Sequence, residues 1–172
     1  RRGIGQGMFN AWSHGYSCMK VTVSDKMLIF PASEVAFLRA EGALRGWNMG
    51  GTAQALYEQA VALSFEERGV SGVGEYLANS TKTPSAYKDP LKGEDGQKYD
   101  YSGSISSTVT VAWNEADDFE KKLEKIITQK WIAIFPNCME AWSEYRRTGY
   151  PKLMPVVHNL SDGVVNSAEG AR

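Results

Sequence analysis

The sequence predicts a mainly α-helical protein, built from helix hairpins and interrupted by a long irregular loop insertion. Apolar residues recur at helical spacing in two regions, 31–63 and 114–147, and glycine or proline ends each run. Between them, residues 70–115 are rich in Gly, Ser, Thr, Asn and Pro and show little periodicity. No long series of strands is present, as a sandwich or a barrel would require.

The first expected hairpin occupies residues 31–69. Pro31 and Ser33 are start signals for a helix that runs to about Arg45, and Phe37, Ala40, Leu44 and Trp47 share one of its faces. Gly50-Gly51 breaks the chain, and Thr52 can cap a second helix that ends before Gly69. Two amphipathic helices joined by a short turn favour an antiparallel hairpin. The second helix carries Ala53, Tyr57 and Ala60, a small-large-small pattern typical of tetratricopeptide repeats, although ordinary helix packing explains it as well.

The insertion at residues 70–115 is longer than most loops in a compact domain, and long loops are often functional. We expect only a short helix around Glu75–Asn79 and a brief strand at Thr108–Val111 within it. Before the first hairpin, Met19–Val23 alternates as a short strand would. The glycine-rich opening near Gly3 does not match a dinucleotide fingerprint, since no strand precedes it and no helix follows, so no nucleotide cofactor is expected.

The second helical region is expected to start with Asn114 as its N-cap, followed by the i,i+4 pairs Asp117/Lys121 and Asp118/Lys122. Its buried stripe is predicted to consist of Phe119, Leu123, Ile127, Trp131 and Ile134. After Pro136, a capping box of Asn137 and Glu140 predicts another helix that reaches Arg147, with Gly149 and Pro151 ending it.

Composition and charge exclude several classes of protein. The chain has 172 residues, of which 42% are hydrophobic and 23% charged, enough for one folded domain with a core. Its net charge of −1 provides no basic field for nucleic acid. The longest apolar stretches, such as Trp131–Phe135, are far shorter than the roughly 20 residues that span a bilayer.

Metal binding is not predicted. Cys18, Cys138, His14 and His158 are isolated in the sequence, whereas a zinc site needs about four clustered ligands. Two partly buried thiols are the favoured interpretation of the cysteines, and a disulfide between them is the alternative.

The ends of the chain lack an initiator Met, a signal peptide and a lipobox cysteine. A trypsin-like protease leaves a terminal arginine, and the chain ends at Arg172, so we expect a proteolytic fragment; an expression boundary is the alternative.

Three motifs occur in a fixed order: FPASEVAFLRAEGALRGW at residues 30–47, ITQKWI at 127–132 and EAWSEYRRTGYP at 140–151. A YxxAVxxS helix at residues 57–64 lies between the first two. Together they resemble the SusD/RagB family, specifically its SusD-like lipoproteins. The resemblance covers about residues 1–160 and the later part of a family member, so residues 1–172 are expected to form a single partial domain, the C-terminal part of a larger protein.

The resemblance implies a tetratricopeptide-like helical fold and a protein without catalytic activity. Such a protein is attached to the Gram-negative outer membrane through an N-terminal lipid that lies outside this chain. It captures oligosaccharides, or peptides, for a SusC-like TonB-dependent transporter. We therefore expect a surface-exposed or periplasm-derived lipoprotein that needs no cofactor.

Four charged residues in these motifs are expected to pair with one another. Glu34 and Glu41 are seven residues apart and share a helix face, and Arg146 and Arg147 are the favoured partners, because buried charges must be paired. Further possible partners are Gln129 and Lys130. As alternatives, the two carboxyls could act as a glycosidase acid and base, or the arginines could clamp an anion.

Aromatic residues are expected to divide into two groups. Trp47, Trp131 and Trp142 lie on apolar helical faces and are predicted to be core residues. The loop aromatics Tyr99, Tyr101 and Trp113 are the candidates for a sugar-binding platform, with pinning of the loop to the protein body as the alternative. A helical adaptor that binds a protein and a hydrolase are the competing functions. The sequence contains none of the familiar nucleophile-base motifs of hydrolases.

Overall fold

The computed structural model describes residues 24, 29–89, 100 and 102–154. The chain divides into two compact units, and the helices all belong to the one formed by Leu28–Pro84 and Ser106–Leu153. The described part of the other unit contains a single antiparallel bridge, Tyr87 to Gly103, and a hydrogen bond of 2.9 Å from the Asp89 N–H to the Ser102 hydroxyl. The predicted strand at Met19–Val23 lies outside the described residues.

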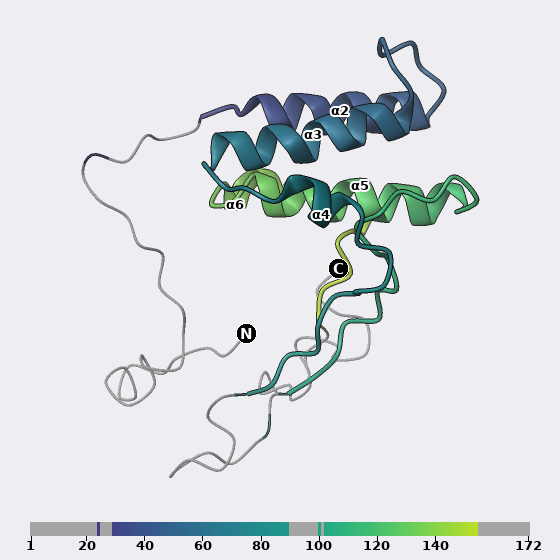
Figure 1. Ribbon diagram of the computed structural model, residues 1–172. Helices are drawn as coiled ribbons and strands as arrows, with labels where there is room; N and C mark the ends of the chain where they lie inside the picture. Colours follow the sequence, from purple (N-terminus) through teal and green to yellow (C-terminus); the bar gives the residue numbers. More distant parts are fainter. Residues whose placement is uncertain (1–23, 25–28, 90–99, 101, 155–172) are drawn as a thin grey trace. The chain divides into compact units, whose positions relative to one another are not determined.

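Helices α2 (Ala32–Leu44) and α3 (Ala53–Glu67) form the predicted antiparallel hairpin (Figure 1). The Thr52 hydroxyl caps α3 by accepting a hydrogen bond of 3.1 Å from the Ala55 N–H. Pro31 begins α2 without a side-chain cap. Instead, Glu67 at the end of α3 accepts hydrogen bonds from the Ser33 N–H, at 3.0 Å, and from its hydroxyl, at 2.6 Å. This carboxylate meets free backbone donors at a helix N-terminus and closes the hairpin.

Helix α5 (Phe119–Ala133) packs against both helices of the hairpin and shares one core with them. The largest fully buried apolar side chains of this shared core are Phe37, Tyr57, Ile126 and Ile127. The Phe37 and Tyr57 rings meet edge to face at 6.3 Å between centroids. Deep burial raises the pKa of the Tyr57 phenol, which stays neutral and donates to the Val111 carbonyl at 2.7 Å.

The insertion contains the short helix α4 (Val73–Leu77), two residues earlier than expected. The strand predicted at residues 108–111 is absent from the part of the chain that the structure describes. Side chains and loops satisfy the backbone there instead of a partner strand: the Ala112 N–H donates to the Asn79 carbonyl at 2.9 Å, and Lys125 donates to the Ala112 carbonyl. The Val111 carbonyl likewise accepts a hydrogen bond from the Tyr57 hydroxyl and not from a neighbouring strand.

The start of α5 was predicted four residues too early. Asn114 caps a turn instead, in which its side chain accepts from the Ala116 N–H at 3.1 Å. Asp118 is the true N-cap and accepts from the Lys121 N–H at 2.8 Å. The Asp117–Lys121 ion pair is present at 3.1 Å, whereas Lys122 pairs with Glu115 rather than with Asp118.

Helix α6 (Cys138–Thr148) follows a turn at the end of α5 and stops at Gly149, whose φ of 75° favours glycine. Asn137 caps α6 as predicted and accepts from the Glu140 N–H at 3.2 Å. The Glu140 side chain, however, binds Lys130 instead of completing a capping box. Cys138 is a free thiol and is exposed, so its predicted partial burial is wrong, and Cys18 lies outside the described residues.

Two of the three tryptophans predicted to be core residues are exposed: Trp47 at 63% and Trp142 at 50%. Trp131 is half-buried, and Phe119, from the predicted buried stripe of α5, is also exposed. Phe119 lies in the first turn of α5, where the Arg45 guanidinium at the end of α2 is 5.6 Å from the centre of its ring. Among the described helices, none has the length and apolar character needed to cross a membrane.

Candidate functional site

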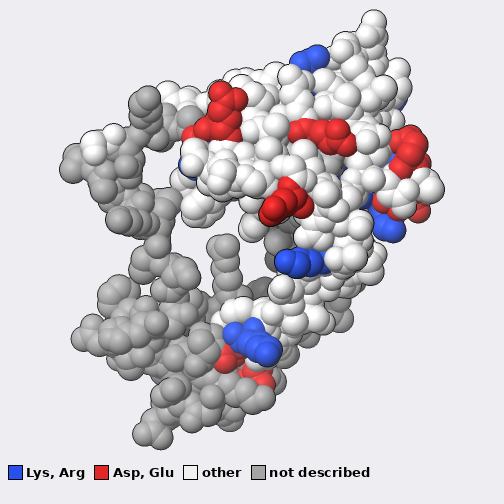
Figure 2. All heavy atoms as spheres, in the orientation of Figure 1, with Lys and Arg blue, Asp and Glu red and all other residues white. Residues whose placement is uncertain are grey.

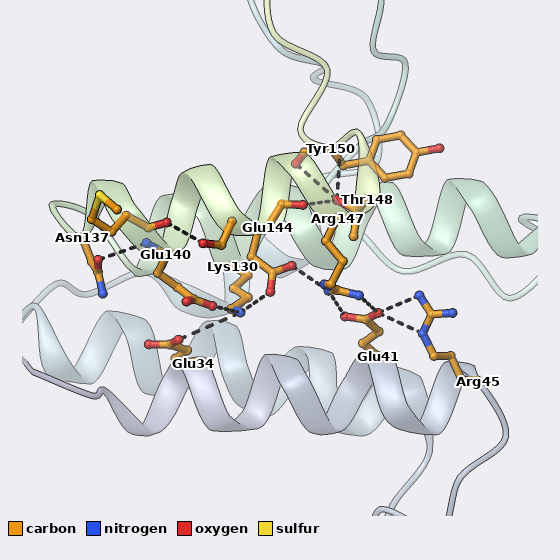
Figure 3. Close-up of polar contacts among 12 residues, drawn as sticks. Glu34, Glu41, Arg45, Lys130, Asn137, Glu140, Glu144, Arg147, Thr148 and Tyr150 are labelled. Carbon is orange, nitrogen blue, oxygen red and sulfur yellow. Dashed lines mark hydrogen bonds and ion pairs between the residues drawn. The ribbon is translucent and has the colours of Figure 1, made fainter. Parts of the chain in front are cut away.

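Arg147 on α6 binds Glu41 on α2 through two parallel hydrogen bonds of 2.6 Å (Figure 3). The same guanidinium contacts Glu144, one turn earlier on α6, at 2.6 Å. Arg45, one turn later on α2, adds a hydrogen bond of 2.9 Å to Glu41. Two guanidinium groups thus hold one buried carboxylate at the contact between α2 and α6, in the bidentate geometry that gives the strongest charge-assisted bonds.

Lys130 on α5 occupies the other end of this contact and is almost fully buried. Its ammonium lies 2.9 Å from Glu140 and 2.8 Å from Glu144, both on α6. Glu34 on α2 is 3.9 Å away, and its Oε2 atom is buried without a hydrogen-bond partner. Figure 3 shows Glu34 and Glu41 both pointing from α2 toward α6, with the Lys130 side chain between the helices.

The two glutamates of α2 differ in acidity. Burial raises the pKa of Glu34, and the nearby carboxylates of Glu140 and Glu144 add to the effect against the opposing Lys130. Burial would also raise the pKa of Glu41, but the hydrogen bonds from Arg147 and Arg45 outweigh it and hold that pKa below its ordinary value. The carboxylates of Glu41 and Glu144 raise the pKa of the Arg147 guanidinium, so it stays charged.

We name these side chains the α2–α6 charge cluster, whose members are Glu34, Glu41, Arg45, Lys130, Glu140, Glu144 and Arg147. Its charges come from α2, α5 and α6 and pair across the interface, except that one oxygen of Glu34 has no hydrogen-bond partner. Arg146, in contrast, points to the exposed side of α6, where its guanidinium lies 5.6 Å from the centre of the Trp142 ring. The structure therefore pairs Arg147 with Glu41, gives Glu34 to Lys130, and brings Arg146 to neither glutamate.

Trp113 lies where the insertion returns to the helical body. Its ring packs on Tyr57 at 5.4 Å between centroids, and the Lys122 ammonium lies 5.8 Å from the ring centre. Its indole N–H donates to Glu115 at 2.7 Å. Tyr99 and Tyr101 lie outside the described residues. Trp113 thus joins the loop to the core while part of its surface stays open to solvent.

Charged side chains are dispersed on the face of the molecule drawn in Figure 2. Over the described residues of that face, separate acidic side chains stand among uncharged atoms, and the basic ones do not gather into a patch. Residues 29–89 and 102–154 also contain no group of three His, Cys, Asp or Glu side chains arranged to hold a metal ion.

Comparison with known proteins identifies the family. The model of the SusD-like family, described as SusD and RagB outer membrane lipoproteins, matches residues 1–172. The chain belongs to the SusD/RagB family. Among curated proteins, no match to this SusD-like chain is found.

Solved structures agree with this assignment. A SusD homologue from Bacteroides ovatus is 68% identical over 100% of the SusD-like chain, with a TM-score of 0.87. A homologue from Bacteroides uniformis is 51% identical over 91% of it, with a TM-score of 0.80. A structure described as a chitin-binding SusD homologue from Flavobacterium johnsoniae is 57% identical over 82% of it, with a TM-score of 0.71. The chain spans 34%, 32% and 28% of these proteins, about a third of their length. The predicted family and the mainly helical, SusD-like fold are confirmed.

Four members of the charge cluster were not among the four charged residues predicted to pair: Arg45, Lys130, Glu140 and Glu144. Lys130 was named only as a further possible partner, and Glu144 was not considered. The motif around Glu144 places it four residues after Glu140, which is one turn along the same side of a helix. That spacing could have indicated a second row of carboxylates opposite Glu34 and Glu41.

Proposed function

We propose that this chain is part of an outer-membrane lipoprotein that captures an oligosaccharide without hydrolysing it and passes it to a SusC-like TonB-dependent transporter. One observation carries the proposal: the chain is 57% identical, over 82% of its length, to a homologue described as chitin-binding. At that identity and a TM-score of 0.71, the shared part has the same fold and more than half of the same residues.

The chemistry of a glycan fits the aromatic residues of the insertion. A sugar ring has an apolar C–H face that packs on an aromatic ring and a rim of hydroxyls that needs hydrogen-bond partners. Trp113 supplies an aromatic surface that the core holds in place, with the Lys122 ammonium beside it. Tyr99 and Tyr101 are proposed as further sugar-contacting residues of the insertion.

The absence of catalysis is supported by the state of the two glutamates that could serve as an acid and a base. Glu41 is bound by two guanidinium groups, and its lowered pKa makes it a poor proton donor near neutral pH. Glu34 has the raised pKa of an acid, yet it is 95% buried beneath Lys130 and α6, away from any sugar in solution. The charge cluster is therefore proposed to hold helices together and not to act on a substrate.

A protein-facing role, as a helical adaptor or a receptor for peptides, is the second candidate. The exposed Trp47 and Trp142 favour it, because large exposed aromatic side chains are enriched where proteins bind one another. In the first candidate, such contacts would serve the transporter or the remainder of the lipoprotein.

Glycan-array and affinity-gel binding test the proposal. The assay uses the 172-residue chain and a chimera in which it replaces its counterpart in the Bacteroides ovatus homologue. Trp113→Ala and Tyr101→Ala are compared with the wild type, and Trp142→Ala is the matched control on α6. We expect retention without hydrolysis, reduced about tenfold or more in either loop variant, since burying a large apolar side chain contributes about 1.5–3 kcal/mol.

Retention of every glycan at the level of an unrelated protein would favour a peptide ligand or an adaptor. Turnover that persists through purification would overturn the non-catalytic part of the proposal. Thermal unfolding of the same variants separates a lost platform from a lost fold, because Trp113 also packs on Tyr57.

A further inference from the structure

The outward side of α2 is apolar. Ala32, Val35 and Leu38 follow one another at three-residue spacing, and all three are exposed. The acidic residues of the helix point to the charge cluster on another side. The Arg39 guanidinium is also engaged elsewhere, because it donates two hydrogen bonds, of 3.1 and 2.7 Å, to the Met49 carbonyl.

Trp47 extends this apolar side beyond the end of the helix. Gly42 lies one turn after Leu38, and a Cβ atom there would come within 2.9 Å of the Met49 side chain and 3.3 Å of the Trp47 ring. The missing side chain lets both residues lie against α2. The Trp47 ring nevertheless remains 63% exposed. We call this exposed apolar surface the α2 outer strip; it consists of Ala32, Val35, Leu38 and Trp47.

The neighbouring helix of the same hairpin has the opposite character. The exposed residues of α3 are Gln54, Ala55, Gln59, Ala62 and Glu66, so its outward side is polar or small throughout. A helix that faces water normally carries polar residues on its outer side. The exposed side of α3 is thus suited to contact with water, whereas the exposed side of α2 is apolar.

The length of the relatives indicates what covers the strip. The chain spans only 34% of the Bacteroides ovatus homologue and 32% of the Bacteroides uniformis homologue, although these two matches cover 100% and 91% of the chain itself. We propose that the α2 outer strip is the surface on which the other two thirds of a SusD-like polypeptide pack, through the apolar face of a helix, with Trp47 as the anchor at one end of the strip. A strip of aliphatic side chains with one large aromatic and no free charge fits an apolar helix face. The inference rests on family membership and is independent of the glycan.

Thiol labelling tests the occupant directly. Leu38→Cys reports on the strip, and Ala62→Cys reports on the polar side of α3, both with Cys18 and Cys138 changed to Ser. Each is labelled in the 172-residue chain and in the chimera with the Bacteroides ovatus homologue. We expect Leu38→Cys to react at least about tenfold more slowly in the chimera than in the chain alone, and Ala62→Cys to react alike in both, because burial blocks thiol reactivity.

Equal reactivity of Leu38→Cys in the two proteins overturns the proposal. Slow reaction in the chain alone, together with a doubled mass in solution, assigns the strip to a second copy and also overturns it. The chain alone provides a second test that does not depend on the chimera. Val35→Lys with Leu38→Lys should lower the binding of an apolar fluorescent dye severalfold, whereas Ala55→Lys with Ala62→Lys should not; equal dye binding by both double variants contradicts an exposed apolar strip.

Discussion

Glu34 and Glu41 point from the same side of α2 toward α6, yet only Glu41 meets a guanidinium. Glu41 lies opposite Arg147, whereas Glu34 lies 3.9 Å from an ammonium that two other carboxylates already bind. Two chemically identical residues on one helix are therefore expected to respond in opposite ways to pH and to substitution. The contrast makes the charge cluster testable without knowledge of the ligand.

Glu41→Gln should lower the free energy of unfolding at pH 7 by about 1–3 kcal/mol, the usual cost of removing a hydrogen-bonded charge, because Arg147 is partly exposed and keeps Glu144 as a partner. Urea denaturation measures the change. Glu66→Gln, on the exposed side of α3, is the matched control and should stay within about 0.5 kcal/mol of the wild type.

The pH dependence of this loss follows from the lowered pKa of Glu41. In the unfolded chain the carboxyl has its ordinary pKa of 4.5, and in the folded chain it ionises at lower pH. The stabilisation is thus fully present above that ordinary value and disappears as the pH falls through the lowered, folded-state pKa. The gap between wild type and Glu41→Gln should close in acid; a gap that stays constant down to low pH would contradict the assignment.

Glu34→Gln should behave in the opposite way. The raised pKa of Glu34 means that its contribution to stability is fully present below the ordinary value of 4.5 and is lost as the pH rises through the folded-state pKa. A neutral amide escapes that loss, so the variant should equal or exceed the wild type in stability at pH 7 and gain nothing at pH 4. Urea denaturation at the two pH values checks this, and a large loss at pH 7 would show that the ionised carboxylate is required.

Lys130→Met should be among the most damaging single changes to the helical body. The ammonium is 1% exposed and neutralises carboxylates on α6, which would then be left without a buried counter-charge. Breaking such a pair costs about 3–5 kcal/mol. Lys121→Met, whose side chain is 43% exposed beside Asp117, should cost less than about 0.5 kcal/mol in the same denaturation assay, and similar losses in the two variants would contradict the buried cluster.

Trp113→Ala should lower the free energy of unfolding by about 2–3 kcal/mol, somewhat below the loss for a fully buried tryptophan, because the ring packs on Tyr57 but is partly exposed. Trp142→Ala, which removes an exposed ring that contacts Arg146, should cost no more than about 1 kcal/mol. Thermal unfolding compares the two. Equal losses would mean that Trp113 does not join the insertion to the core.

The sequence predicted those features of the fold that depend on neighbouring residues. The limits of α3 were correct because Thr52 caps it and Gly69 follows its last turn. The start of α5 was placed too early because Asn114 and Asp118 are both good capping residues four positions apart. Leu123, in the second turn from Asp118, belongs to the buried core, a tertiary contact that the local capping pattern does not reveal.

The partners of the charged residues and the exposure of the tryptophans depend on tertiary structure. Which of two adjacent arginines faces α2 is set by the rotation of α6 against that helix, which the order of residues alone does not reveal. Trp47 was predicted to be a core residue from its apolar neighbours, and that property would equally suit an interface with another part of a longer protein. Such an interface lies beyond the third of the relatives that this chain spans.

The most direct test of the proposed function is equilibrium binding of chitin oligosaccharides to the chimera, with the bound sugar recovered and its length determined by mass spectrometry. Capture without catalysis predicts saturable binding and recovery of the oligosaccharide at its original length after prolonged incubation. Shortened products that accumulate with time, or no binding of any oligosaccharide in a panel, would contradict it.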